Sequence, residues 1–150
     1  MSLAQFSIPM NKAVRCPILS CELFLLVAHP NIDPDAISEA LALEPALLHA
    51  AGQPVTTPKG GETGGNYAWS KWQYIQTVHN EEKAQEQLLV LLSHLESRES
   101  EILALVGSGA RAELFFRTAN KEHFSIELYP ETLGRLSKLG VSFGYEQFNS

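Results

Sequence analysis

The chain has 150 residues, which is the usual size of one domain. Hydrophobic residues make up 45% of the sequence and charged residues 19%, a balance that is typical of globular proteins and excludes a largely disordered chain. The formal net charge of -6 gives the whole molecule a field that repels phosphate backbones. Nucleic acid is therefore not expected as a partner.

The N-terminal residues show no clear periodicity, and we predict an arm over residues 1–20. The apolar run at 23–28 is too short for a signal peptide and far shorter than the roughly 20 residues of a membrane span. A cytoplasmic protein with no membrane contact is the prediction. The 2 cysteines, Cys16 and Cys21, do not complete a zinc site. We interpret them as ordinary thiols, with a redox or disulfide role as the alternative.

Residues 21–29 form the first predicted strand. Both alternating sets of its side chains are apolar, with Leu25 and Val27 in one set and Phe24 and Leu26 in the other. A strand with this pattern is buried on both faces.

A helix is predicted next, with Asp33 as its N-cap and Pro34 at its first position, where the missing N–H costs nothing. Pro45 bounds this helix. Residues 49–66 are then rich in Gly, Pro, Thr and Gln and are predicted to be a long loop.

The elements that follow are predicted in the order strand, helix, strand, strand, helix, strand, which is typical of a ferredoxin-like sandwich. The predicted ranges are 67–78, 80–107 with a break at 96–101, 111–118, 123–129, 130–139 and 141–145. The third and fourth of these ranges are expected to pair as a hairpin. We therefore predict one α+β domain over 21–150, with a ferredoxin-like unit at 67–147. Its sheet is expected to be five-stranded, mixed and mostly antiparallel, with helices mainly on one face.

The sequence carries no recognisable catalytic or metal-binding pattern. Its 5 histidines are dispersed, and no two of them have the i, i+4 spacing of a helical metal pair. No Gly-x-Ser-x-Gly elbow occurs, and the glutamates at 96–101 suit a solvated helix face. No catalytic residue, metal or cofactor is predicted.

The glycine-rich stretch from Lys59 to Gly65 differs from a phosphate-binding loop. Lys59 precedes the glycines and the stretch leads into a strand, whereas a phosphate loop has its lysine after the glycines and leads into a helix. Glu62 adds a charge that repels phosphate. A surface loop is predicted, with a nucleotide cradle as the alternative.

Trp69 and Trp72 follow this polar loop, and large aromatic side chains beside a loop suit a binding groove. We therefore name Lys59, Glu62, Trp69 and Trp72 as candidate ligand- or partner-binding residues. The alternative is that one or both tryptophans complete the core, because their rings bury a large area.

Several short motifs resemble a small bacterial family catalogued as domain of unknown function 4279. They are Asp33-Pro34-Asp35-Ala36-Ile37, Leu41-Ala42-Leu43-Glu44-Pro45, Lys59-Gly60, Ser70-Lys71-Trp72, the leucines from Leu88 to Leu95, and Leu136-Ser137-Lys138-Leu139-Gly140. In such sequences the first helix usually ends Leu-Gly-(Ile/Leu)-x-Pro, and Ala42 stands here in place of the glycine. The resemblance covers residues 21–147 and supports the architecture, but it implies no catalytic residues.

Small size, acidity and the lack of a reactive constellation favour a non-enzymatic binding or regulatory module, such as an immunity-like partner protein whose acidic surface blocks a basic target. The alternative is a small enzyme or ligand sensor that uses a groove between loop 49–66 and Trp69/Trp72. Because helices on one side leave the other side of the sheet exposed, we also predict a homodimer that packs sheet to sheet or edge to edge. The arm or the long loop could cover that face instead.

Overall fold

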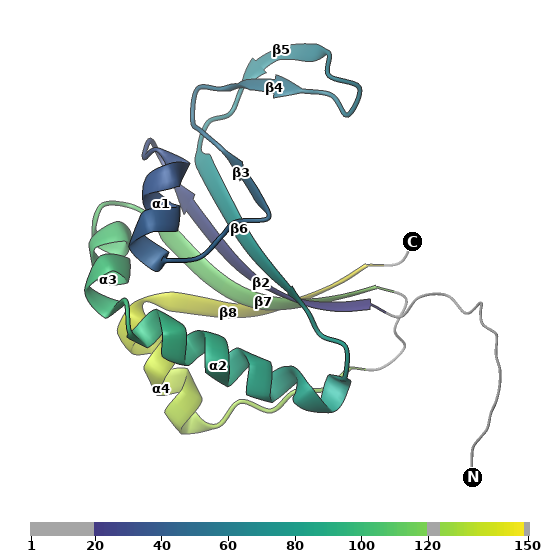
Figure 1. Ribbon diagram of the computed structural model, residues 1–150, viewed down its shortest axis with the longest axis vertical. Helices are drawn as coiled ribbons and strands as arrows, with labels where there is room; N and C mark the ends of the chain where they lie inside the picture. The colour runs from purple at the N-terminus through teal and green to yellow at the C-terminus, as the bar shows by residue number, and fades with distance from the viewer. Residues whose placement is uncertain (1–19, 120–123, 149–150) are drawn as a thin grey trace, which may run out of the picture.

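A computed structural model of the chain describes residues 20–119 and 124–148. Its main sheet has five strands in the order β3-β6-β2-β7-β8 (Figure 1). β2 is antiparallel to both of its neighbours, β3 is antiparallel to β6, and β7 and β8 are parallel. The strands are β2 Ser20–His29, β3 Leu47–His49, β6 Ser70–Thr77, β7 Arg111–Ala119 and β8 Val141–Phe148.

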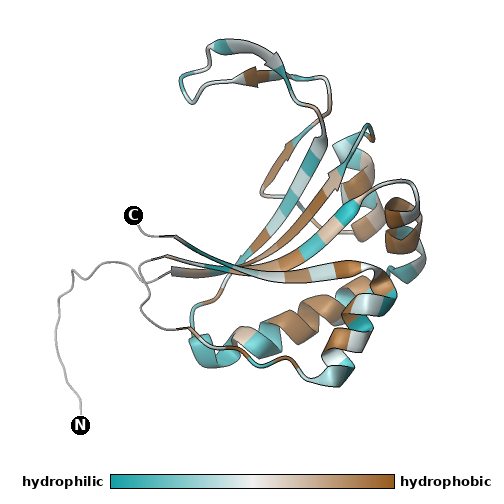
Figure 2. Ribbon diagram, turned by 180° about the vertical axis from the view of Figure 1, so that it is seen from behind, coloured by the Kyte–Doolittle hydropathy of each residue, from teal (hydrophilic) through white to brown (hydrophobic). Residues whose placement is uncertain are grey.

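The helices form a second layer on one face of this sheet (Figure 1), so the fold is α+β as predicted. Figure 2 shows apolar residues, in brown, along α2 where it lies beside the sheet. The helices are α1 Pro34–Leu41, α2 Ala84–Glu96, α3 Glu99–Gly107 and α4 Pro130–Leu139, and a 3-10 turn, η2 Glu81–Lys83, precedes α2.

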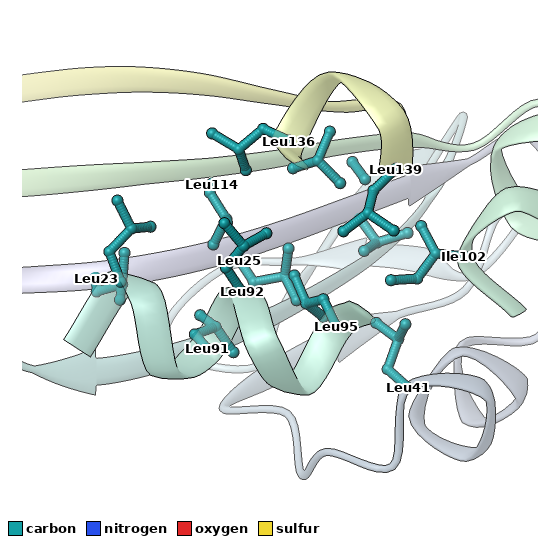
Figure 3. Packing of buried hydrophobic residues seen from close by; sticks show 14 of the residues in the cluster. Leu23, Leu25, Leu41, Leu91, Leu92, Leu95, Ile102, Leu114, Leu136 and Leu139 are labelled. Carbon is teal, nitrogen blue, oxygen red and sulfur yellow. The ribbon is translucent and has the colours of Figure 1, made fainter. Parts of the chain in front are cut away.

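One apolar core joins the two layers. Leu25 of β2 and Leu114 of β7 face Leu92 of α2 and Leu136 of α4 (Figure 3), and all four side chains are buried. The helical spacing of leucines in α2 places this set on the inner face of the helix. Burial of these side chains is the main favourable term for the domain.

The helix ends follow their local signals. Asp33 Oδ1 accepts a hydrogen bond of 3.0 Å from the backbone N–H of Asp35, which caps α1. Gly140 ends α4 in the left-handed conformation, with φ 74°. Ala42 ends α1 in the same conformation, with φ 55° and ψ 44°, although a side chain with a Cβ is disfavoured there.

Donors from the α2–α3 region hold the last turn of α1. His94 Nε2 donates to the carbonyl oxygen of Leu41 at 2.7 Å, and Arg98 Nε donates to that of Ala40 at 2.8 Å. These bonds satisfy carbonyls that have no partner inside the helix. Tertiary contacts therefore support the left-handed residue that follows.

β2 is the central strand, which explains its two apolar sets. Leu25 is 1% exposed on the helix side and Phe24 is 2% exposed on the other side. Leu26, next to Phe24 on that second side, is half-buried. The prediction of a strand buried on both faces is therefore confirmed for the helix side and for Phe24, whereas Leu26 and Ala28 on the second side are half-buried.

The predicted strand at 123–129 is wrong, because residues 124–129 form no strand. β7 has β2 on one side and β8 on the other, so no edge is free for the predicted hairpin partner. The apolar residues of this segment pack against the core instead, and the Phe124 ring centroid lies 5.5 Å from those of Phe116 and Tyr145.

The ferredoxin-like unit predicted for 67–147 is accordingly not confirmed. The sheet is mixed, because β7 and β8 pair in parallel whereas the other neighbouring strands pair antiparallel.

The long loop predicted at 49–66 includes the last residue of β3 and a two-stranded hairpin, β4 Pro54–Thr56 and β5 Glu62–Asn66. Figure 1 shows that the hairpin extends beyond the start of β6, away from α1 and α3. We call residues 54–66 the hairpin arm. Its residues are exposed except for half-buried Val55.

No helix in the described part of the chain is long and apolar enough to cross a membrane. The predicted N-terminal arm and Cys16 lie outside the described residues, except that Ser20 already belongs to β2. Cys21 is buried in β2.

Candidate functional site

The face of the sheet opposite the helices carries no helix in the described ranges, and we call it the open face. Strand register arranges its side chains in rows across the sheet. The row nearest the hairpin arm contains His49, Lys71, Ala28 and Arg111 from four adjacent strands.

The middle of the open face is apolar. The rings of Phe24 and Phe115 stack with centroids 4.9 Å apart, and the guanidinium carbon of Arg117 lies 4.6 Å from the centroid of Phe24. Leu26 lies beside this pair on β2, between Gln73 and Glu113. The aromatic pair stabilises the face, and Leu26 remains accessible.

The far end of the open face carries an ion pair. Arg117 of β7 donates from Nε and Nη2 to Oε1 of Glu146 on β8, each at 3.1 Å. Glu22 of β2 lies opposite Arg117 in the register. This end therefore combines one cation with two carboxylates.

A groove runs along the open face between these two ends. It has two parts, of about 350 Å³ and 230 Å³, which share Leu26 and Glu113 as lining residues. Lys71, Gln73 and Arg117 line the larger part, and Ala28, Arg111 and Ser142 line the smaller. The floor is apolar and the walls are charged.

Lys71 and Arg111 are the cross-strand neighbours of Ala28, one on each side. Two strand spacings separate their Cα atoms, roughly 10 Å, and both side chains are long enough to meet above the small Ala28. Neither has an ion-pair partner among the residues that the structure describes. One end of the groove therefore holds two uncompensated positive charges.

Glu113 lines both parts of the groove. Its Oε2 lies 3.2 Å from the place where a Cβ on Gly144 would stand. The missing side chain of Gly144 thus makes room for this carboxylate on the β8 side. Glu113 leans away from the β6 strand that carries Lys71.

His49 lies at the base of the hairpin arm, and its ring stacks on Tyr67 with centroids 3.5 Å apart. Burial lowers the pKa of the His49 imidazole, and the nearby positive charge of Lys71 lowers it further. Its Nδ1 is buried and has no hydrogen-bond partner in the described ranges. A neutral ring beside Lys71 leaves the positive charge of this row on the lysine and arginine.

His29 has a structural role. His29 Nδ1 accepts from the backbone N–H groups of Asn31 and Ile32, so its Nε2 carries the proton that is donated to Ser108 Oγ at 3.0 Å. Within residues 20–119 and 124–148, no group of three or more His, Cys, Asp or Glu side chains is arranged to hold a metal ion.

The structure does not bring the four sequence-predicted site residues together. Trp72 is 0% exposed on the helix side, where its Nε1 donates to Ser38 Oγ at 2.9 Å; it completes the core, as the alternative proposed. Trp69 is 40% exposed, and Lys59 and Glu62 are exposed on the hairpin arm. A binding role for Lys59, Glu62 and Trp69 stays a prediction.

Sequence reasoning missed the residues that line the groove. A signal was present, because Arg111, Glu113 and Arg117 alternate with buried Leu114 and Phe116 along β7. Such alternation predicts a polar second face. The convergence with Lys71 depends on the position of β2 between β6 and β7, which local patterns do not encode.

Comparison with known proteins gives one match. The model of a family described as a domain of unknown function (DUF4279) matches residues 20–148. No curated protein and no solved structure matches the chain.

Proposed function

We propose that this chain, which belongs to the DUF4279 family, is a non-enzymatic binding module that holds an extended segment of a partner protein on its open face. The groove of the open face carries this proposal, because its apolar floor and charged walls are accessible while the helices cover only the other side. Clefts of this kind are where proteins bind ligands.

The geometry of the groove suits an extended segment. Its lining side chains stand in rows two residues apart, roughly 7 Å along the strands. An extended peptide presents its own alternate side chains at the same spacing. Apolar side chains of such a segment would rest on Leu26 and beside Phe115, and polar ones would reach Gln73 and Ser142.

The local charge refines the kind of partner. The net charge of -6 suggested a basic target for an immunity-like protein. The unpaired Lys71 and Arg111 favour an acidic segment at this groove instead, because the charge nearest the contact dominates once salt screens distant charges.

The test is affinity capture from the native host with two matched variants. Leu26→Gln changes the floor of the groove, and Val90→Gln changes a 63% exposed residue on α2. We expect a partner that the parent and Val90→Gln retain and that Leu26→Gln loses. Equal retention by all three proteins would refute the groove as the binding surface.

A small enzyme or ligand sensor is the alternative. Buried Trp72 offers no surface for the groove first predicted, so this alternative now depends on Trp69, Lys59 and Glu62 near the hairpin arm, or on the larger part of the open-face groove, whose 350 Å³ falls in the range of small-ligand pockets. Turnover of a small molecule that is lost in Glu113→Gln would favour it. The cytoplasmic location and the single domain over 21–150 stay predictions.

We further propose a homodimer formed through β8. This strand is at the edge of the sheet, and no strand of the described residues pairs with its outer side. It has no proline and no lysine to discourage pairing, and its one charged residue, Glu146, is bound to Arg117. Exposed Leu133 of α4 and Tyr145 of β8 add apolar surface at this edge.

Antiparallel pairing centred on Gly144 would place Phe143 beside Tyr145 of the partner subunit on the helix side, and Ser142 beside Glu146 of the partner subunit on the open side. Both pairs are favourable, and the groove stays free.

Light scattering at micromolar concentration tests this dimer, with twice the chain mass of 16.5 kDa expected. Leu133→Lys should shift the mass toward the monomer, whereas Val90→Lys should not. A parent mass near 16.5 kDa at all concentrations contradicts the dimer.

A further inference from the structure

We propose that Lys71 and Arg111 form a carboxylate subsite at the arm-proximal end of the groove, which holds an acidic side chain of the bound segment. This inference rests on the proposed function of the groove and adds the chemical class of its ligand. The feature that carries it is a pair of cations in register across one small residue, Ala28, with no acidic partner in the described ranges.

The surroundings of the two cations favour a ligand of mixed character. Leu26 and Ala28 provide an apolar floor, so a bare inorganic ion would leave part of the contact surface unused. An acidic side chain on an extended backbone would satisfy both parts, since its carboxylate would accept bonds from the two cations while an apolar side chain two residues away covers Leu26. Hydrogen bonds between charged groups are the strongest of their kind.

Among the described residues that line this end of the groove, Glu113 is the one acidic residue, and its position limits its effect. Its carboxylate lies over Gly144 on the β8 side, so it does not stand between Lys71 and Arg111. It remains close enough to repel a bound carboxylate. Removal of its charge should therefore strengthen binding, the opposite of what removal of either cation should do.

The positive charge of Lys71 also affects the neighbouring residue His49. The pKa of the His49 imidazole is lowered, first by burial and then by the positive charge of Lys71. A neutral histidine at this position neither competes for the carboxylate nor compensates the lysine.

A peptide titration tests the subsite. The probe is acetyl-Val-Thr-Glu-Thr-Val-amide, whose Glu and two Val side chains lie on one face of an extended chain. It is compared with its glutamine analogue and with inorganic phosphate, and binding is followed by amide chemical shifts in NMR. We expect the acidic peptide to shift the amide signals of Ala28, Lys71 and Arg111 and to bind more tightly than the analogue or phosphate. Its affinity should fall as salt concentration rises.

Charge variants give a pattern of signs that a purely structural role would not produce. Lys71→Met and Arg111→Met should each weaken binding of the acidic peptide roughly tenfold, and Glu113→Gln should strengthen it. Lys83→Met is the matched control, because Lys83 is a 63% exposed lysine on the helix side; its affinity should equal that of the parent.

The outcomes separate the two proposals. If Leu26→Gln weakens binding while Lys71→Met and Arg111→Met do not, the subsite is wrong and the groove stands. If neither the cation variants nor Leu26→Gln change the affinity, both are wrong. Phosphate that binds as tightly as the peptide overturns the carboxylate assignment, and so does an acidic peptide that does not bind at millimolar concentration.

Discussion

The two faces of the five-stranded sheet are built from the same strands but have different chemistry. On the helix side, the side chains of β2 and β7 are buried and apolar, as in Leu25 and Leu114. On the open side, β7 carries charged residues at both ends, whereas β2 carries apolar residues and one charged residue, Glu22. The first face stabilises the fold, and the second leaves functional groups accessible.

The central strand β2 contributes to both faces, with one set of side chains in the main core and the other on the open face. β2 has no polar residue between Leu23 and Ala28, so its sequence alone does not distinguish its faces. The neighbours make the difference, because Lys71, Arg111 and Glu113 all lie on the open side of the flanking strands. Substitutions on one face or the other test whether the two faces differ in burial and in binding.

The largest loss of stability is expected from substitution of Trp72 on the helix side. Trp72→Ala should lower the free energy of unfolding by about 3–5 kcal/mol, the usual range for a large buried aromatic side chain, because it removes a fully buried ring and the hydrogen bond to Ser38. Trp69→Ala is the control, since that ring is 40% exposed, and it should change stability far less. Urea denaturation measures both; a Trp72 variant as stable as the parent would contradict its place in the core.

A direct comparison of the faces comes from two consecutive residues of β2. Leu25→Ala should cost about 3 kcal/mol, because it leaves a cavity in the main core. Leu26→Ala should cost about 1 kcal/mol, because this side chain is only half-buried on the open face. Equal losses in urea denaturation would mean that the open face is covered as fully as the helix side.

The sequence predicted those elements whose signals are local. Asp33 with Pro34 marked the start of α1, and Gly140 marked the end of α4. The strand prediction for the segment at 124–129 was wrong because its alternating apolar residues give the same sequence pattern in a paired strand and in an unpaired segment that packs on a core. Pairing depends on a free edge, and the positions of β2 and β8 beside β7 are set by tertiary structure.

The candidate site was less predictable than the fold. Lys71 and Arg111 are far apart in the chain and meet only through their shared neighbour Ala28. Trp72, the most conspicuous residue of the predicted site, is conspicuous because its ring is large, and large rings are often buried. Glu113 depends on Gly144 for its position, a relation between two strands that no single segment reveals.

A stabilising change is expected within the helix layer. Ala42→Gly should raise the free energy of unfolding by about 0.5–1 kcal/mol, because the left-handed φ of 55° strains a residue with a Cβ and suits glycine. The gain is partly offset by the greater freedom of glycine in the unfolded chain. Thermal melting of the variant beside the parent measures it; a lower melting temperature would show that tertiary bonds from His94 and Arg98 already remove the strain.

The smallest effect concerns an ion pair between two helices of the covered side. Arg135 Nε and Nη2 each donate to a carboxylate oxygen of Glu96 at 2.8 Å, and these bonds lower the pKa of the Glu96 carboxyl. Because the folded pKa lies below the unfolded value, the pair contributes stability above the ordinary pKa of 4.5 and loses it as pH falls through the lowered value. The side chains are 34% and 37% exposed, so solvent screening keeps the contribution small.

Glu96→Gln should therefore melt slightly below the parent at pH 7, and the difference should shrink as the pH falls below about 4.5. Glu44→Gln, at an exposed glutamate, should follow the parent throughout this range. A difference between Glu96→Gln and the parent that grows toward low pH would reverse the sign of the argument. Since this pair lies on the helix side, its loss should leave peptide binding at Lys71 and Arg111 unchanged, whereas the charge variants of the open face should change binding and leave the melting temperature nearly constant.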